Sequence, residues 1–161
     1  MIVDEVVDEI GKIRGMTRLD EDLFDDPPRQ SAEQKAKEFE RWSFATGLSK
    51  VDLVNEIAKV IAVEFHAGRM TFAFGDAIAN YLFSVINDAR MADDSLAWKV
   101  YLAFDLGEYT PNEISTVPMI AEIVQRIRVK KRFGEIQTWK SGFEAKRCQR
   151  RRCKSAPGYF R

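Results

Sequence analysis

The densest run of apolar and aromatic residues in the chain extends from Phe72 to Tyr109. Its first half repeats apolar side chains at spacings of three and four, which is the pattern of a helix with a wide buried face. Phe83 lies outside that face. The second half, residues 95–106, is apolar on nearly every side, as is typical of a helix surrounded by other helices. The run therefore predicts two helices joined at residues 91–94, of which the second is the central helix of the fold. The apolar face of the first helix comprises Phe74, Ala77, Ile78, Tyr81, Leu82, Val85 and Ile86.

Two shorter helices with their own start and end signals open the chain. Residues 2–13 carry an apolar face at helical spacing, and Gly15 can end that helix. A second helix begins after Ser31, because Ser31 and Gln34 match the capping box, in which two side chains bond free backbone amides of the first turn. Gly47 can end this helix, since glycine readily takes the left-handed conformation found at many helix ends.

The remaining helix signals complete the prediction of the fold class. Ser49 can cap a helix over residues 50–67, which has the clearest amphipathic pattern in the chain. After the central pair, Gly107 can end the second helix, and a short helix is expected from Thr110 before a long one that ends near Arg132. No segment alternates apolar and polar residues as a strand would. We therefore expect an all-α fold, a single compact multi-helix domain of about six or seven helices.

Beyond Phe133 the helical pattern stops, and the last residues combine glycine, proline and scattered aromatic residues with a basic run. We therefore expect a helical domain over residues 1–133 and a basic, partly ordered C-terminal tail over residues 134–161. The two cysteines, Cys148 and Cys153, lie close together in this tail, so they cannot cross-link the core whatever their redox state. Stability is expected to come from side-chain packing.

The formal net charge of zero conceals a marked asymmetry along the chain. Residues 1–127 hold 13 Lys and Arg against 23 Asp and Glu, a net charge of −10, whereas residues 128–161 hold 12 against 2, a net charge of +10. Such a division indicates an acidic body with a basic tail. The tail then either folds back on the body or binds another anionic partner, and the sequence leaves both alternatives open.

The sequence also carries expectations about location. It has no run of about 18 apolar residues that could span a bilayer. The first ten residues, MIVDEVVDEI, contain acids that a secretory signal or transit peptide avoids. We therefore expect a cytoplasmic protein with no membrane contact.

Motifs for catalysis and metal binding are not found in the sequence. His66 is the single histidine and belongs to no recognised catalytic motif with a Ser or Cys. Two cysteines without a second pair do not make a zinc site. Phosphate-binding glycine loops, nucleophile elbows and zinc-protease motifs are missing too. The sequence therefore assigns no catalytic residue, no metal and no cofactor, and it favours a non-enzyme without excluding an enzyme of another kind.

Four polar residues in the apolar central pair are the candidate binding residues. Asp76 and Asn80 lie one helical turn apart, on what is either an exposed face or a site. Asp105 and Glu108 fall where the second helix is expected to end, although acids at a helix C-terminus oppose the helix dipole. A local rule broken beside a core often marks a site, but an ion pair from Asp105 to an arginine such as Arg126 would explain it equally.

Three classes of function remain. An acidic helical body suits an interaction protein that binds a protein partner, in the way that immunity proteins mask a basic partner, and this class leads. A small-molecule enzyme that uses carboxylates around Asp105 is a further alternative. Nucleic-acid binding through the tail is the other, and the oligomeric state is left open. The basic residues of the tail that would contact phosphates are Lys146, Arg147, Arg150, Arg151, Arg152 and Lys154.

The tail generates the first prediction, which concerns deletion of residues 135–161. We expect no sequence-specific nucleic-acid binding to be lost, because the tail offers no helical reading element to base edges. If the tail folds against the acidic body, deletion should lower the melting temperature, more strongly at low salt where charges act over a longer range. Thermal melts and binding to DNA and RNA at two salt concentrations test this. Sub-micromolar binding that disappears on deletion, with the melt unchanged, would reverse the ranking of the three classes.

Overall fold

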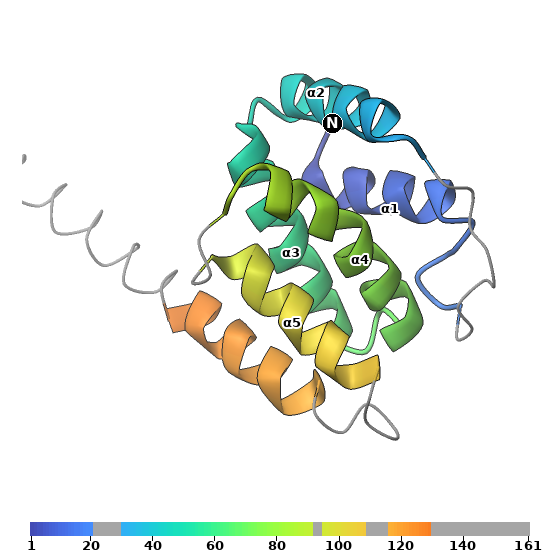
Figure 1. Ribbon diagram of the computed structural model, residues 1–161. Helices are drawn as coiled ribbons and strands as arrows, with labels where there is room; N and C mark the ends of the chain where they lie inside the picture. The colour runs from blue at the N-terminus through green and yellow to red at the C-terminus, as the bar shows by residue number, and fades with distance from the viewer. Residues whose placement is uncertain (21–29, 92–94, 109–115, 130–161) are drawn as a thin grey trace, which may run out of the picture. The chain divides into compact units, whose positions relative to one another are not determined.

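The computed structural model describes residues 1–20, 30–91, 95–108 and 116–129, and within these ranges the regular structure is helical, without a strand (Figure 1). The predicted all-α fold is confirmed. A further helix covers residues 116–129. The other five helices are α1 (Val3–Ile13), α2 (Ala32–Thr46), α3 (Lys50–His66), α4 (Phe72–Asp88) and α5 (Leu96–Glu108).

The chain divides into two units, Met1–Val124 and Gln125–Arg161, and residues 125–129 are the described part of the second. The predicted boundary after residue 133 and the predicted order of the tail therefore stay predictions. The short helix expected from Thr110 also lies outside the described residues. All that follows on packing concerns the first unit.

The predicted capping signals form the expected hydrogen bonds. Ser31 Oγ accepts the backbone N–H of Gln34 at 3.2 Å, and Gln34 Oε1 accepts the backbone N–H of Ser31 at 2.8 Å. Ser49 caps α3 as predicted, by accepting the amide three residues on. Thr71, which the sequence analysis did not identify, caps α4 in the same way. At the end of α2, Gly47 has φ 71°, the left-handed conformation that a side chain would disfavour. These bonds fix where the helices begin and end.

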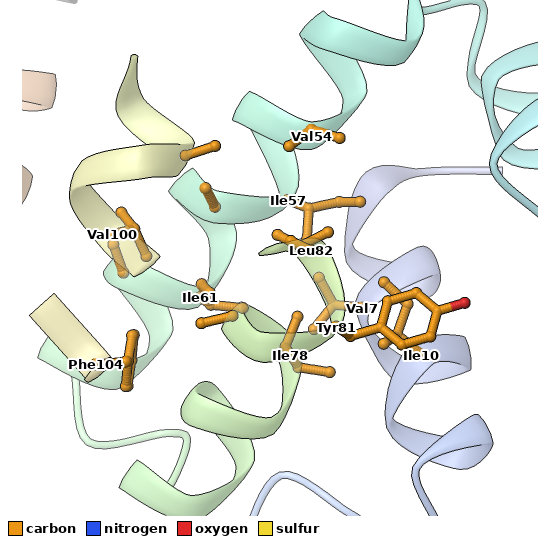
Figure 2. Packing of buried hydrophobic residues seen from close by; sticks show 14 of the residues in the cluster. Val7, Ile10, Val54, Ile57, Ile61, Ile78, Tyr81, Leu82, Val100 and Phe104 are labelled. Carbon is orange, nitrogen blue, oxygen red and sulfur yellow. The ribbon is translucent and has the colours of Figure 1, made fainter. Parts of the chain in front are cut away.

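The core of the first unit forms around α3 and α4. Helix α3 contacts α1, α2, α4 and α5, and α4 contacts α1, α3 and α5. Figure 2 shows side chains from α1, α3, α4 and α5 pointing toward one another in this core. Each large side chain buried there contributes about 1.5–3 kcal/mol through removal of apolar surface from water. Members labelled in the figure are Val7, Ile10, Val54, Ile57, Ile61, Ile78, Tyr81, Leu82, Val100 and Phe104.

The most buried helix is α4, not the helix predicted to be central. In α4, 11 of 17 residues are buried, whereas in α5 five of 13 are. The apolar residue Leu106 on α5 is exposed at 47% of its surface. An apolar residue on every side of α5 suggested enclosure, but exposed apolar side chains are common on protein surfaces.

Gly107 does not end α5 as predicted, because the helix continues to Glu108 and Gly107 is buried within it. Its missing side chain instead permits close packing. A Cβ atom added at Gly107 would lie 2.6 Å from Cε2 of Phe72 and would also clash with the hydroxyl of Thr116. That hydroxyl donates a hydrogen bond of 2.9 Å to the carbonyl of Ala103. Helix propensity favoured glycine as a terminator, and tertiary packing determined its use here.

None of the helices in the described ranges has both the length and the apolar character to cross a bilayer.

The close contact at Gly107 predicts the outcome of Gly107→Ala. We expect a loss of about 1–3 kcal/mol in the free energy of unfolding, because the clash outweighs the gain in helix propensity of up to about 1 kcal/mol. Chemical denaturation of the variant, of Thr116→Ala and of the double variant measures the effect. The two losses should be less than additive, since Thr116→Ala removes the clashing hydroxyl. A more stable Gly107→Ala protein would show that propensity dominates at this position.

Candidate functional site

The candidate site lies where α4 and α5 pack side by side (Figure 1). Asp76 and Asn80 are four residues apart on α4, so both lie on one stripe of that helix. Asp105 and Glu108 are three residues apart, which also places both on one stripe, here of α5. The amide of Asn80 connects the two stripes, because its Nδ2 donates to Asp76 Oδ2 at 3.0 Å and to Glu108 Oε1 at 3.1 Å. We refer to Asp76, Asn80, Asp105 and Glu108 as the carboxylate cluster.

Asp76 is the most unusual member of the carboxylate cluster. Its side chain is 2% exposed, and Asp76 is the one acidic or basic residue that is buried among the residues that the structure describes, where Thr116 is the other buried polar residue. While Oδ2 accepts the Asn80 amide, Oδ1 has no hydrogen-bond donor. A buried carboxylate without a donor or a cation costs several kcal/mol, so proteins seldom keep one. The alternative that Asp76 lies on an exposed face is therefore wrong, although Asn80 is exposed.

The surroundings of Asp76 change its acidity. Burial, followed by the charge of Glu108 and a hydrogen-bonding interaction with its carboxyl group, raises the pKa of the Asp76 carboxyl group from 3.8 to about 7. The charge of Asp105 adds to the rise, whereas the hydrogen bond from Asn80 opposes it. A second carboxylate next to a buried carboxyl group disfavours a second negative charge. Asp76 can therefore take up or release a proton near neutral pH.

An aromatic group adjoins the carboxylate cluster through Tyr101. The Tyr101 hydroxyl donates to Asp105 Oδ1 at 3.1 Å, and burial together with this carboxylate raises the pKa of Tyr101 to about 12. Its ring stacks on Phe83 with centroids 4.5 Å apart, and the Trp98 ring lies 5.6 Å from it. All three rings are partly exposed. We refer to Phe83, Trp98 and Tyr101 as the aromatic strip.

The acidic members of the cluster differ from the acidic residues of the unit that form ion pairs. Arg18 forms ion pairs with acids of α1 and α3, and Arg41 with acids of α1 and α2. Within the described part of the first unit, no Lys or Arg pairs with Asp76, Asp105 or Glu108. The cluster therefore concentrates negative charge that its own helices leave without a cation.

Not all expectations for the site can be compared with the structure. Arg126 belongs to the second unit, so its ion pair with Asp105 stays a prediction. The basic run of the tail, Lys146 to Lys154, lies outside the described residues. Across the described ranges, no group of three or more His, Cys, Asp or Glu is arranged to hold a metal ion.

The sequence analysis did not include the aromatic strip in the site. One signal for it was present, because Phe83 falls outside the apolar face of its helix and therefore cannot point into the core. Its stacking partners on α5 had no such signal, since every face of that helix contains apolar residues.

Comparison of the chain with models of protein families, with curated proteins and with solved structures finds no match. Function is therefore inferred from the residues between α4 and α5.

The buried carboxyl group predicts how Asp76→Asn changes stability with pH. The folded-state pKa of about 7 exceeds the ordinary value of 3.8, so the folded protein binds the proton more tightly. The contribution of Asp76 to stability therefore falls as pH rises between these values, and it is fully lost above pH 7. The uncharged amide avoids this loss. We expect Asp76→Asn to match the wild type near pH 4 and to exceed it at pH 8 by up to about 4 kcal/mol.

Urea denaturation at several pH values measures this difference. Asp88→Asn is the matched control, because Asp88 is an exposed acid on the same helix and its replacement should leave the pH profile almost parallel to that of the wild type. A variant Asp76→Asn that is less stable at every pH would mean that the carboxylate is a net stabilising group.

Proposed function

We propose that the protein is a non-catalytic binding protein that uses the surface between α4 and α5 to bind a basic segment of a protein partner. The observation that carries this proposal is the buried carboxylate of Asp76, which has an oxygen without a donor and two further acids beside it. A cationic side chain from a partner would supply the missing donor and the missing charge.

The unfavourable free energy of Asp76 supports a role in binding over a role in stability. Replacing a buried charge by an uncharged group of similar size is often neutral or stabilising. A residue that lowers stability and lies beside a partly exposed surface is typical of a functional site, where stability and function conflict. Folding removes the Asp76 carboxylate from water, which costs free energy. Binding of a cation would offset that cost.

The aromatic strip supports a protein as the partner. Aromatic residues and arginine are enriched at the energetic centres of protein interfaces, whereas isolated ions need no such surface. Partly exposed rings next to acids can contact both the alkyl stem and the charged end of a basic side chain. The strip and the carboxylate cluster are joined by the hydrogen bond between Tyr101 and Asp105, so they form one continuous candidate surface.

The charge of the chain supports a basic partner. The net charge of −10 over residues 1–127 would accelerate encounter with a positively charged protein and disfavour an acidic one. The carboxylate cluster would repel the phosphates of a nucleic acid. These charges fit the masking of a basic partner better than they fit phosphate binding at this surface.

The experiment compares two charge-matched double variants of the full-length protein. Asp105→Asn/Glu108→Gln removes two charges from the cluster, and Glu33→Gln/Glu40→Gln removes two charges from the exposed face of α2. Partners are captured from a native cell lysate, and the affinity of each captured protein is then measured with purified components. We expect the first variant to bind a basic partner about ten-fold or more weakly, and the second to bind it like the wild type.

The dependence on salt provides a second measurement. Binding through the cluster should weaken as salt rises, because part of the attraction is between exposed charges. If every captured partner binds both double variants equally, the surface between α4 and α5 is not the binding site and the proposal fails.

A further inference from the structure

The carboxylate cluster has two features that a general attraction for positive charge does not explain. Asp76 Oδ1 lies buried without a donor, beside the carboxyl group of Glu108. In addition, the partly exposed Tyr101 ring adjoins the acids, with its flat face stacked on Phe83. Together these features restrict both the shape of the cation and the way in which it enters.

We propose that the surface between α4 and α5 binds the guanidinium group of an arginine, which enters between the carboxyl groups of Asp76 and Glu108. This inference rests on the proposed function and names the ligand group and the linked proton of the same site.

The geometry of the acceptors favours guanidinium over ammonium. The cluster offers several carboxylate oxygens from two helices, including the free Oδ1 of Asp76. A guanidinium has five N–H donors in a planar fork and can bond two carboxylates at once, whereas a lysine ammonium is a point charge with three donors. Guanidinium is also less strongly hydrated, so its transfer to a partly buried place costs less, and it packs on aromatic rings such as Tyr101.

The groups that face Asp76 explain why binding should release a proton. From α5 these groups are Glu108, Asp105 and the hydroxyl of Tyr101, and from α4 itself the neutral amide of Asn80. From α1 and α3, which also pack on α4, no described charged residue forms a hydrogen bond or ion pair with Asp76. The charges named here are negative, and they favour the protonated form of Asp76 in the free site.

The exchange balances as follows in atoms and charge. The O–H bond of the protonated Asp76 carboxyl group breaks, and its proton passes to solvent. The guanidinium keeps all of its protons and donates N–H groups to the two carboxylates. The site thereby gains one positive ligand and loses one proton, without any redox step.

Access to Asp76 is provided by Glu108. Although Asp76 is buried, Glu108 is exposed at the last position of α5 and its side chain has three rotatable bonds. Glu108 Oε1 accepts a hydrogen bond from the exposed amide of Asn80. Rotation of Glu108 would therefore open a path to Asp76 Oδ1 while the helices stay in place.

The test uses nuclear magnetic resonance on the full-length protein with carbon-13 in the aspartate carboxyl groups. The probe is N-acetyl-arginine amide, whose single charge is the guanidinium. Asp76→Asn identifies the resonance of Asp76. We expect this resonance to titrate near pH 7 in the free protein and at least one pH unit lower with saturating probe. By linkage, the probe should bind at least about five-fold more weakly at pH 6 than at pH 8.

Matched probes and variants separate the parts of the inference. N-acetyl-citrulline amide has nearly the same shape without the charge and should not shift the titration. Nα-acetyl-lysine amide, whose single charge is the side-chain ammonium, should bind several-fold more weakly than the arginine probe. In Glu108→Gln the titration of Asp76 should move to lower pH and the pH dependence of binding should diminish. Glu40→Gln, an exposed change on α2, should behave as the wild type.

Three results would overturn the inference. Equal binding of the lysine and arginine probes would remove the preference for guanidinium. An affinity that does not change between pH 6 and pH 8 would remove the proton exchange. If the arginine probe leaves the Asp76 resonance unchanged while a captured partner still depends on Asp105 and Glu108, the proposed function stands and the anchor is a different group.

Discussion

The structure of the first unit depends on the enclosure of α4 among α1, α3 and α5. Burying 11 of its 17 residues supplies much of the apolar surface that drives folding, and it leaves little of the helix for polar groups. Asp76 lies on that enclosed helix and must share its environment. The raised pKa of Asp76, the lack of a donor to its Oδ1 and the effect of Glu108 on that pKa all follow from the buried position of the helix.

The enclosure of α4 also determines how much charge the fold tolerates. The net stability of a domain is small compared with the terms that compose it, so one buried carboxylate is a substantial fraction of it. Such a group persists only where packing supplies a surplus or where a ligand restores the balance. The proton that Asp76 can hold near neutral pH is one such compensation, and the proposed binding of a cation would be another.

Much of the fold and part of the site could be predicted from the sequence. Short-range signals such as the bonds of Ser31 with Gln34 were reliable, because they need only neighbouring residues. The contact between Asp76 and Glu108 depends on which faces of α4 and α5 pack together. The pattern of residues along one helix does not specify which face of another helix it contacts. The same is true of Gly107, whose role depends on Phe72 and Thr116 from other segments. A polar residue on an apolar helix is also compatible with an exposed face, so the burial of Asp76 needed the structure.

The close approach at Gly107 has a consequence for the neighbouring residue. Because the backbone there is held against Phe72 and Thr116, the end of α5 cannot shift without disrupting the core. Glu108 therefore follows a closely packed backbone position and has an exposed side chain. Recognition by Glu108 would then cost the entropy of a few side-chain rotations. The missing Cβ of Gly107 thus permits the close packing next to Glu108, the residue whose side chain would rotate in the proposed binding.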